Sequence, residues 1–217
     1  MRSIGFFLAL AAAGLWCGQA NAAPQEITGG NTTLTFTVDL DELDVDVSAN
    51  GAAEMTSPGV FVLPITSGVA DLPAVQGSIQ HEDSGLAFDF GSVTIDADNL
   101  EFDFDDLQVN GDLAAGPIEL HTGIFNVVLC SEGGCVGPGG SVPTTGYGLF
   151  LRAQAADFFE NNVFGDVVFD DEDQILYAQT QPEFAGGVPE PGLATLLGVA
   201  LTAVACVSRK RTSSHGA

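Results

Sequence analysis

The feature that most constrains the fold is a period-two alternation of apolar and polar residues in the middle of the chain. Residues 33–40 place an apolar side chain at every second position, and residues 86–90, 93–95 and 100–104 repeat the pattern. Successive side chains of a strand point to opposite faces of a sheet, so each run offers one apolar face to a core. The alternation therefore predicts half-buried antiparallel strands.

Short polar and glycine-containing stretches punctuate these runs. Asn50-Gly51, Ser84-Gly85 and Asn110-Gly111 have the composition of tight turns. The glycine-rich residues 132–148 predict a long loop.

One segment departs from period two. Residues 153–162, AQAADFFENN, contain helix formers, and Ala155, Phe158 and Phe159 form an apolar stripe at helical spacing. The predicted fold class is all-β: an antiparallel β-sandwich or flattened barrel with this one short helix over an end of the sheet. A β-solenoid is the alternative, suggested by the short strands of residues 86–109, although no fixed repeat period accompanies them.

The first residues have the parts of a secretory signal peptide. Arg2 precedes an uncharged apolar run over residues 4–15, and small residues at 20–22 form an A-x-A cleavage site. A membrane-spanning helix is the alternative, but the run is shorter than the roughly 20 residues that a span needs. We therefore expect a signal peptide, with its signal helix, over residues 1–22. An all-β extracellular domain over residues 23–180 and a linker over residues 181–187 follow it.

A second uncharged segment lies near the C-terminus. Pro189 and Pro191 each lack a backbone N–H and interrupt regular structure. The residues after them predict a transmembrane helix over 192–208, with three cations at 209–211 as its membrane stop. Because positive charge stays on the cytoplasmic side, we expect the N-terminal part outside and residues 212–217 as a cytoplasmic tail. A buried core helix is the alternative.

These C-terminal features resemble the PEP-CTERM sorting signal of Gram-negative bacteria, here over residues 188–211. The matching residues outside the apolar helix are Val188, Pro189, Glu190 and Pro191 in the sorting motif and Arg209, Lys210 and Arg211 in the basic cluster. The resemblance implies that an exosortase recognises the motif, cleaves near it, and releases the protein from the inner membrane or re-anchors it at the cell surface. It also implies an association with exopolysaccharide and biofilm production.

Charge is distributed unevenly along the chain. There are 29 acidic residues against 5 Lys and Arg, and Arg152 is the only one of these cations between the two apolar ends. Binding to a phosphate backbone depends on Lys and Arg, so the composition argues against nucleic acid as a partner. A polyanionic domain fits solubility outside the cell, divalent counterions or a cationic partner.

Two of the four cysteines belong to the expected domain. Cys17 falls in the signal peptide and Cys206 in the transmembrane segment, which leaves Cys130 and Cys135. In an exported protein, a pair with this short spacing predicts a small disulfide loop. A metal site is the alternative, although no second pair of Cys or His accompanies it.

Catalytic motifs are absent from the sequence, which contains no G-x-S-x-G elbow, H-E-x-x-H or phosphate loop. We therefore expect no enzymatic activity. Clustered acids offer oxygen ligands for Ca²⁺, and the best candidate is the loop run with Asp170, Asp171 and Asp173. No acidic run matches an EF-hand loop, and solvent-exposed acidic strand faces are the alternative explanation.

Residues 77–102 resemble part of the secreted β domains of the haem-binding HtaA type, in which a histidine precedes a Gly-Leu strand and a second alternating strand. His81 is the residue that this resemblance carries over to haem binding. The family's axial tyrosine near the start of the domain has no counterpart, because the only tyrosines are Tyr147 and Tyr177. A surface histidine before a turn is the alternative.

Together these features predict an exported, exosortase-processed protein of the cell surface or extracellular matrix, associated with exopolysaccharide and biofilm and without catalytic activity. The expected partners are the exosortase, extracellular polysaccharide and, before processing, the inner membrane. No cofactor is expected on this interpretation. The competing prediction is a secreted module that binds calcium or haem.

Overall fold

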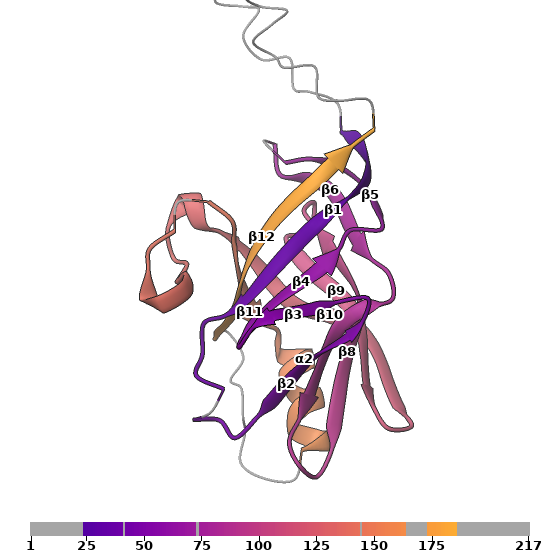
Figure 1. Ribbon diagram of the computed structural model, residues 1–217, viewed down its shortest axis with the longest axis vertical. Coiled ribbons are helices and arrows are strands. Elements are labelled where there is room, and N and C mark those ends of the chain that lie inside the picture. Colours follow the sequence, from indigo (N-terminus) through magenta and orange to yellow (C-terminus); the bar gives the residue numbers. More distant parts are fainter. Residues whose placement is uncertain (1–23, 41, 73, 144, 164–172, 186–217) are drawn as a thin grey trace, which may run out of the picture. The chain divides into compact units, whose positions relative to one another are not determined.

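The computed structural model describes residues 24–40, 42–72, 74–143, 145–163 and 173–185, which form an antiparallel all-β fold with one α-helix (Figure 1). The predicted class is confirmed. The helix is α2 (Ala153–Asn162), and two 3₁₀ turns, η1 (Cys130–Glu132) and η2 (Pro138–Gly140), lie between β10 and β11. The strands are β1 (Gln25–Phe36), β2 (Asp46–Gly51), β3 (Glu54–Ser57), β4 (Val60–Pro64), β5 (Ser67–Asp71), β6 (Gln76–His81), β7 (Ser84–Asp89), β8 (Thr94–Asp103), β9 (Gln108–Ala115), β10 (Ile118–Leu129), β11 (Tyr147–Leu151) and β12 (Gln174–Phe184).

The sheet closes on itself. Neighbouring strands follow the order β12-β11-β10-β9-β8-β6-β5-β1, and β1 pairs with β12 again. Two branches leave this ring, one from β1 through β4 to β3 and one from β8 through β7 to β2. Closure favours the barrel over the sandwich among the predicted architectures. The solenoid alternative is wrong, because the described pairs are antiparallel rather than stacked in parallel coils.

Strand β8 joins two sequence runs that alternate in opposite phase. Ile95 and Ala97 are buried in its first half, whereas Leu100 and Phe102 are buried in its second half. The register against β9 shifts between Asp98 and Glu101, and Asn99 has a φ of 53°. A β-bulge adds one residue to a strand, so both apolar runs face the same core.

The core is built from phenylalanine and aliphatic side chains of many strands. Phe36 packs edge-on against Phe61, with ring centroids 5.9 Å apart, and against Phe88 at 6.1 Å. Such edge-to-face contacts add to the free energy gained from apolar burial. The largest fully buried side chains are Phe61, Phe102, Phe104, Leu34, Leu63, Ile79, Leu86, Ile95, Leu100, Leu113, Ile124 and Leu149.

The helix occupies the predicted residues. Ala155, Phe158 and Phe159 are its buried positions, which confirms the apolar stripe. Phe159 contacts Phe88 edge-on, with 5.4 Å between ring centroids, and Phe90 at 6.0 Å. The apolar stripe of α2 therefore packs into the hydrophobic core.

Three expectations about boundaries are wrong. β1 ends at Phe36, although the alternation continues to residue 40. Asn110-Gly111 lies inside β9, and Asn50-Gly51 and Ser84-Gly85 are paired strand residues of β2 and β7, so none of the three predicted turns lies at its dipeptide. A Cβ on Gly111 would lie 2.9 Å from the carbonyl oxygen of Asp98, so this glycine permits a close approach of two strands. β12 continues to Phe184, so residues 181–184 of the expected linker are strand.

The predicted targeting segments lie outside the described residues. These are the signal peptide 1–22, the sorting motif 188–191, the membrane helix 192–208, the basic cluster 209–211 and the tail 212–217. Within the described ranges, no helix has the length and apolar character needed to cross a membrane.

Candidate functional site

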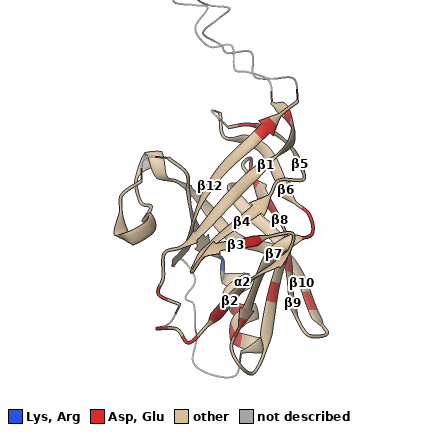
Figure 2. Cartoon of the chain, in the orientation of Figure 1, with Lys and Arg blue, Asp and Glu red and all other residues tan. Residues whose placement is uncertain are grey.

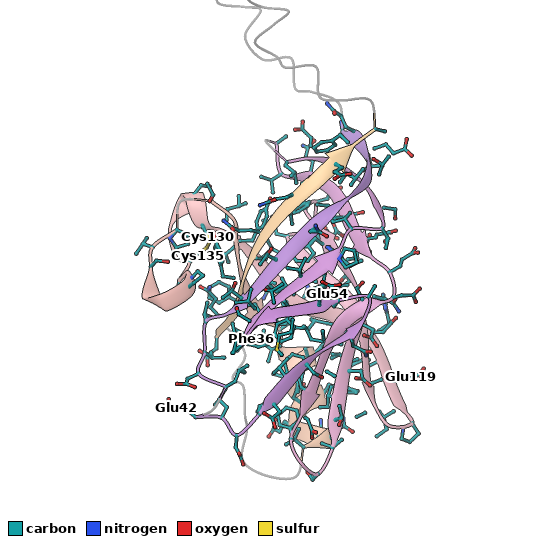
Figure 3. All side chains as sticks on the ribbon, in the orientation of Figure 1. Phe36, Glu42, Glu54, Glu119, Cys130 and Cys135 are labelled. Atoms are coloured by element: carbon teal, nitrogen blue, oxygen red, sulfur yellow. A yellow bond between two sulfur atoms is a disulfide. The ribbon has the colours of Figure 1, made fainter. Side chains whose placement is uncertain are left out.

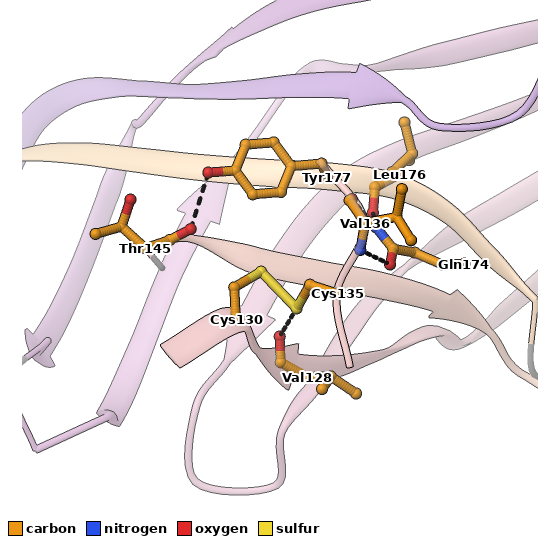
Figure 4. Close-up of a disulfide and its surroundings, with 8 residues drawn as sticks. All are labelled: Val128, Cys130, Cys135, Val136, Thr145, Gln174, Leu176 and Tyr177. Atoms are coloured by element: carbon orange, nitrogen blue, oxygen red, sulfur yellow. Dashed lines mark hydrogen bonds between the residues drawn. A yellow bond between two sulfur atoms is a disulfide. The ribbon is translucent and has the colours of Figure 1, made fainter. Parts of the chain in front are cut away.

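A disulfide anchors the long loop between β10 and β11. Cys130 and Cys135 are joined through their sulfur atoms with Cα atoms 5.1 Å apart, and both residues are buried (Figure 4). Cys135 Sγ lies 3.4 Å from the carbonyl oxygen of Val128 on β10. This is the pairing expected from the spacing of the two cysteines, and it occupies the sulfur atoms that the metal alternative would need.

Two side chains of β12 hold the rest of the loop. The backbone N–H of Val136 donates to Gln174 Oε1 at 2.7 Å, and Gln174 Nε2 donates to the carbonyl oxygen of Val136 at 2.6 Å. The hydroxyl of Tyr177 donates to the carbonyl oxygen of Thr145 at 2.8 Å (Figure 4). The side-chain amide of Gln174 thereby pairs with both backbone groups of Val136, as the backbone of a neighbouring strand would.

The anchored loop carries apolar side chains into solvent. Val142 is 82% exposed and Val136 is 45% exposed. The sequence from residue 133 to residue 151 contains no charged side chain, in contrast to the acidic remainder. An exposed, uncharged apolar tip suits contact with a neutral surface, but nothing in the described structure covers it.

His81 lies in the core and not on the surface, so the surface-histidine alternative is wrong. The residue is 0% exposed. Its Nδ1 lies 3.1 Å from the carbonyl oxygen of Leu100, and its Nε2 lies 2.8 Å from Oγ1 of Thr32. A carbonyl oxygen only accepts, so Nδ1 carries the proton and donates to Leu100, while Nε2 accepts from the Thr32 hydroxyl.

This environment keeps the His81 ring neutral. Burial lowers the pKa of His81 from 6.5 to about 4, and the hydrogen bond to Leu100 offsets part of that effect. In this conformation neither nitrogen is open to an iron atom. The geometry therefore gives no support to the haem hypothesis, which stays a prediction.

Of the three residues predicted to bind calcium, the structure describes one. Asp170 and Asp171 lie outside the described residues, and Asp173 is exposed just before β12. Among the residues that the structure describes, no group of three or more His, Cys, Asp or Glu side chains is arranged to hold a metal ion.

Acids on β8 and β9 are instead bridged by amides. Nδ2 of Asn50 donates to Asp96 Oδ1 at 3.3 Å and to Asp98 Oδ2 at 3.1 Å. Burial, and then the charges of Asp96 and Asp112, raise the pKa of Asp98. A 2.8 Å hydrogen bond from Asn99 Nδ2 to Asp112 Oδ2 holds the pKa of Asp112 below its usual range. Sequence inspection missed this network because Asn50 comes from the distant strand β2.

A hollow of about 600 Å³ opens between β2 and β3. The end of β1 and residues 37–40 line it together with the start of β2, Met55 of β3, and Pro58 and Gly59 after β3. No local pattern in the sequence predicts it, because it exists only where two strands diverge. Its apolar lining residues are Phe36, Val38, Leu40, Val45, Val47, Met55 and Pro58.

Comparisons with known proteins identify no family. No family model matches the chain, and no curated protein matches it. Among solved structures, the chain is similar to the crystal structure of the C-terminal domain of HtaA from Corynebacterium glutamicum. That similarity has 13% sequence identity and a TM-score of 0.46, and covers 73% of this chain and 99% of the other. A likeness of this size carries no argument about function.

Proposed function

We propose that this chain is an exported protein without catalytic activity, processed by an exosortase and destined for the cell surface or extracellular matrix, where it accompanies exopolysaccharide. The disulfide between Cys130 and Cys135 is the observation that carries the proposal. Structural disulfides form and persist in oxidising compartments outside the cytoplasm. The disulfide therefore supports export through the predicted signal peptide.

The charge of the domain supports the same destination. Arg152 is the only Lys or Arg in the described ranges, and its guanidinium donates to Gln108 Oε1. The domain is otherwise anionic, which favours solubility and disfavours binding to nucleic acid.

Processing of point variants in the native host tests the proposal. Pro191→Ala and Glu190→Gln should leave the full-length chain in the inner-membrane fraction, because both change the motif that the exosortase is proposed to recognise. Glu183→Gln is the matched control, since Glu183 is an exposed acid of β12 outside the motif. Blotting of membrane and extracellular fractions gives the readout. Unchanged processing of Pro191→Ala would contradict the assignment.

A further inference from the structure

Two strand edges border the hollow between β2 and β3. These strands follow one another in the chain, yet they are not paired with each other: among the described strands, β2 pairs with β7 alone and β3 with β4 alone. Each therefore has one edge that no described strand covers. Such an edge is a template for pairing with the backbone of another chain.

The surface between these edges combines apolar side chains with polar ones, among them Thr35, Thr37 and Asp39. Phe36 and Val45 line it and are 9% and 5% exposed. Met55 of β3 lines the same hollow and is 53% exposed, which is a large exposed fraction for an apolar side chain. An added strand would direct alternate side chains toward this apolar lining and the others toward solvent.

The charges around the opening have one sign. Asp46 of β2 and Glu54 of β3 are exposed, and Glu42 and Asp44 lie in the segment that leads into β2. Figure 2 colours the acidic residues red, and Figure 3 labels Glu42 and Glu54. The sequence of residues 37–57 contains no Lys or Arg. Complementarity of charge therefore favours a cationic occupant.

We propose that the opening between β2 and β3 binds an extended, cationic segment of a partner protein by β-strand addition. The partner's backbone pairs with the uncovered edges of β2 and β3, and its apolar side chains cover Phe36 and Val45. Its lysine or arginine side chains lie beside Asp46 and Glu54. Backbone pairing supplies affinity in this mode of recognition, and the alternate side chains supply specificity.

Fluorescence anisotropy with labelled peptides tests the proposal on the full chain purified in a mild detergent. The probe is a capped peptide of six residues, the length of β2, in which lysine alternates with valine. A second peptide carries N-methyl groups on alternate residues, which removes the N–H donors along one of its two edges, and a third has aspartate in place of lysine. We expect the first to bind, the second to bind more than about tenfold more weakly because three N–H donors are lost, and the third not to bind.

Protein variants locate the site. Met55→Lys places a cation at the β3 edge and should weaken binding at least about fivefold through like-charge repulsion. Ile118→Lys is the matched control, because Ile118 is 51% exposed on the distant β9–β10 hairpin. Asp46→Asn combined with Glu54→Gln should weaken binding about fivefold at low salt, whereas Glu119→Gln combined with Glu160→Gln should not.

Three results would overturn the proposal. One is equal binding of the lysine peptide and its N-methylated form, since backbone pairing would then be absent. Another is equal loss of binding in Met55→Lys and Ile118→Lys. The third is a dimer, measured by sedimentation velocity, that dissociates in the Met55→Lys variant but persists when the lysine peptide is added. A second copy of the chain would then occupy the opening.

Discussion

Protonation of the buried His81 should make the fold less stable in mild acid. The unfolded chain binds this proton with a pKa of 6.5, whereas burial lowers the pKa of His81 in the fold to about 4. Between these values the unfolded state binds more protons than the folded state, so the free energy of unfolding falls as pH falls. The full contribution is present above pH 6.5 and is lost progressively down to about pH 4.

The size of the effect follows from the two pKa values. A tenfold change in a protonation equilibrium corresponds to about 1.4 kcal/mol. The difference between the unfolded and folded pKa values of His81 therefore amounts to about 3 kcal/mol in the free energy of unfolding. About 2 kcal/mol of this should be lost between pH 7 and pH 5, where most carboxylates stay ionised. This loss is a large fraction of the 5–15 kcal/mol that is typical of domains.

Urea unfolding at pH 7 and pH 5, followed by circular dichroism, measures this loss. His81→Gln should reduce the difference between the two pH values to near zero, even where it lowers stability at both. Thr32→Val keeps the buried histidine and should keep the pH dependence. A pH dependence that survives in His81→Gln would refute the reasoning.

Three further predictions concern the disulfide, the acidic network and calcium. Cys130→Ser with Cys135→Ser should lower the free energy of unfolding by about 2 kcal/mol in urea titrations, because the unfolded chain gains conformational entropy when the disulfide no longer closes the loop. An unchanged free energy of unfolding would contradict this prediction. Asp98→Asn should raise the melting temperature at pH 7, because the raised pKa of Asp98 means that the fold holds its neutral form more tightly. That gain should vanish below pH 3.8, and a gain that persists there would exclude the electrostatic cause. Calcium chloride and sodium chloride of matched ionic strength should raise the melting temperature equally; a calcium-specific rise that Asp170→Asn with Asp171→Asn removes would establish a calcium site.

Features encoded by neighbouring residues were predictable. The helix over residues 153–162 shows a 3.6-residue period within a single segment, and the structure forms it over those residues. The strand runs show a period of two within a few residues each, and most of them are strands. Cys130 and Cys135 are five positions apart, so their pairing needs little more than a turn.

Features that join distant segments were not predictable. The bulge in β8 brings two runs of opposite phase onto one face, and its position depends on the register against β9. His81 is buried because its partners Thr32 and Leu100, 49 and 19 positions away, meet it in the core. A lone histidine before a turn has the same local pattern whether it is buried or exposed.

The sequence alone determined the fold class, because alternation and helical spacing are local consequences of how side chains project from a strand or a helix. It also determined the anionic character of the domain, and it predicts targeting signals at both ends. Only the tertiary structure decided that β1 and β12 close the sheet, and that β2 and β3 are not paired with each other. Strand pairing depends on backbone hydrogen bonds and packing between residues far apart in the chain, and neither leaves a periodic trace in the sequence.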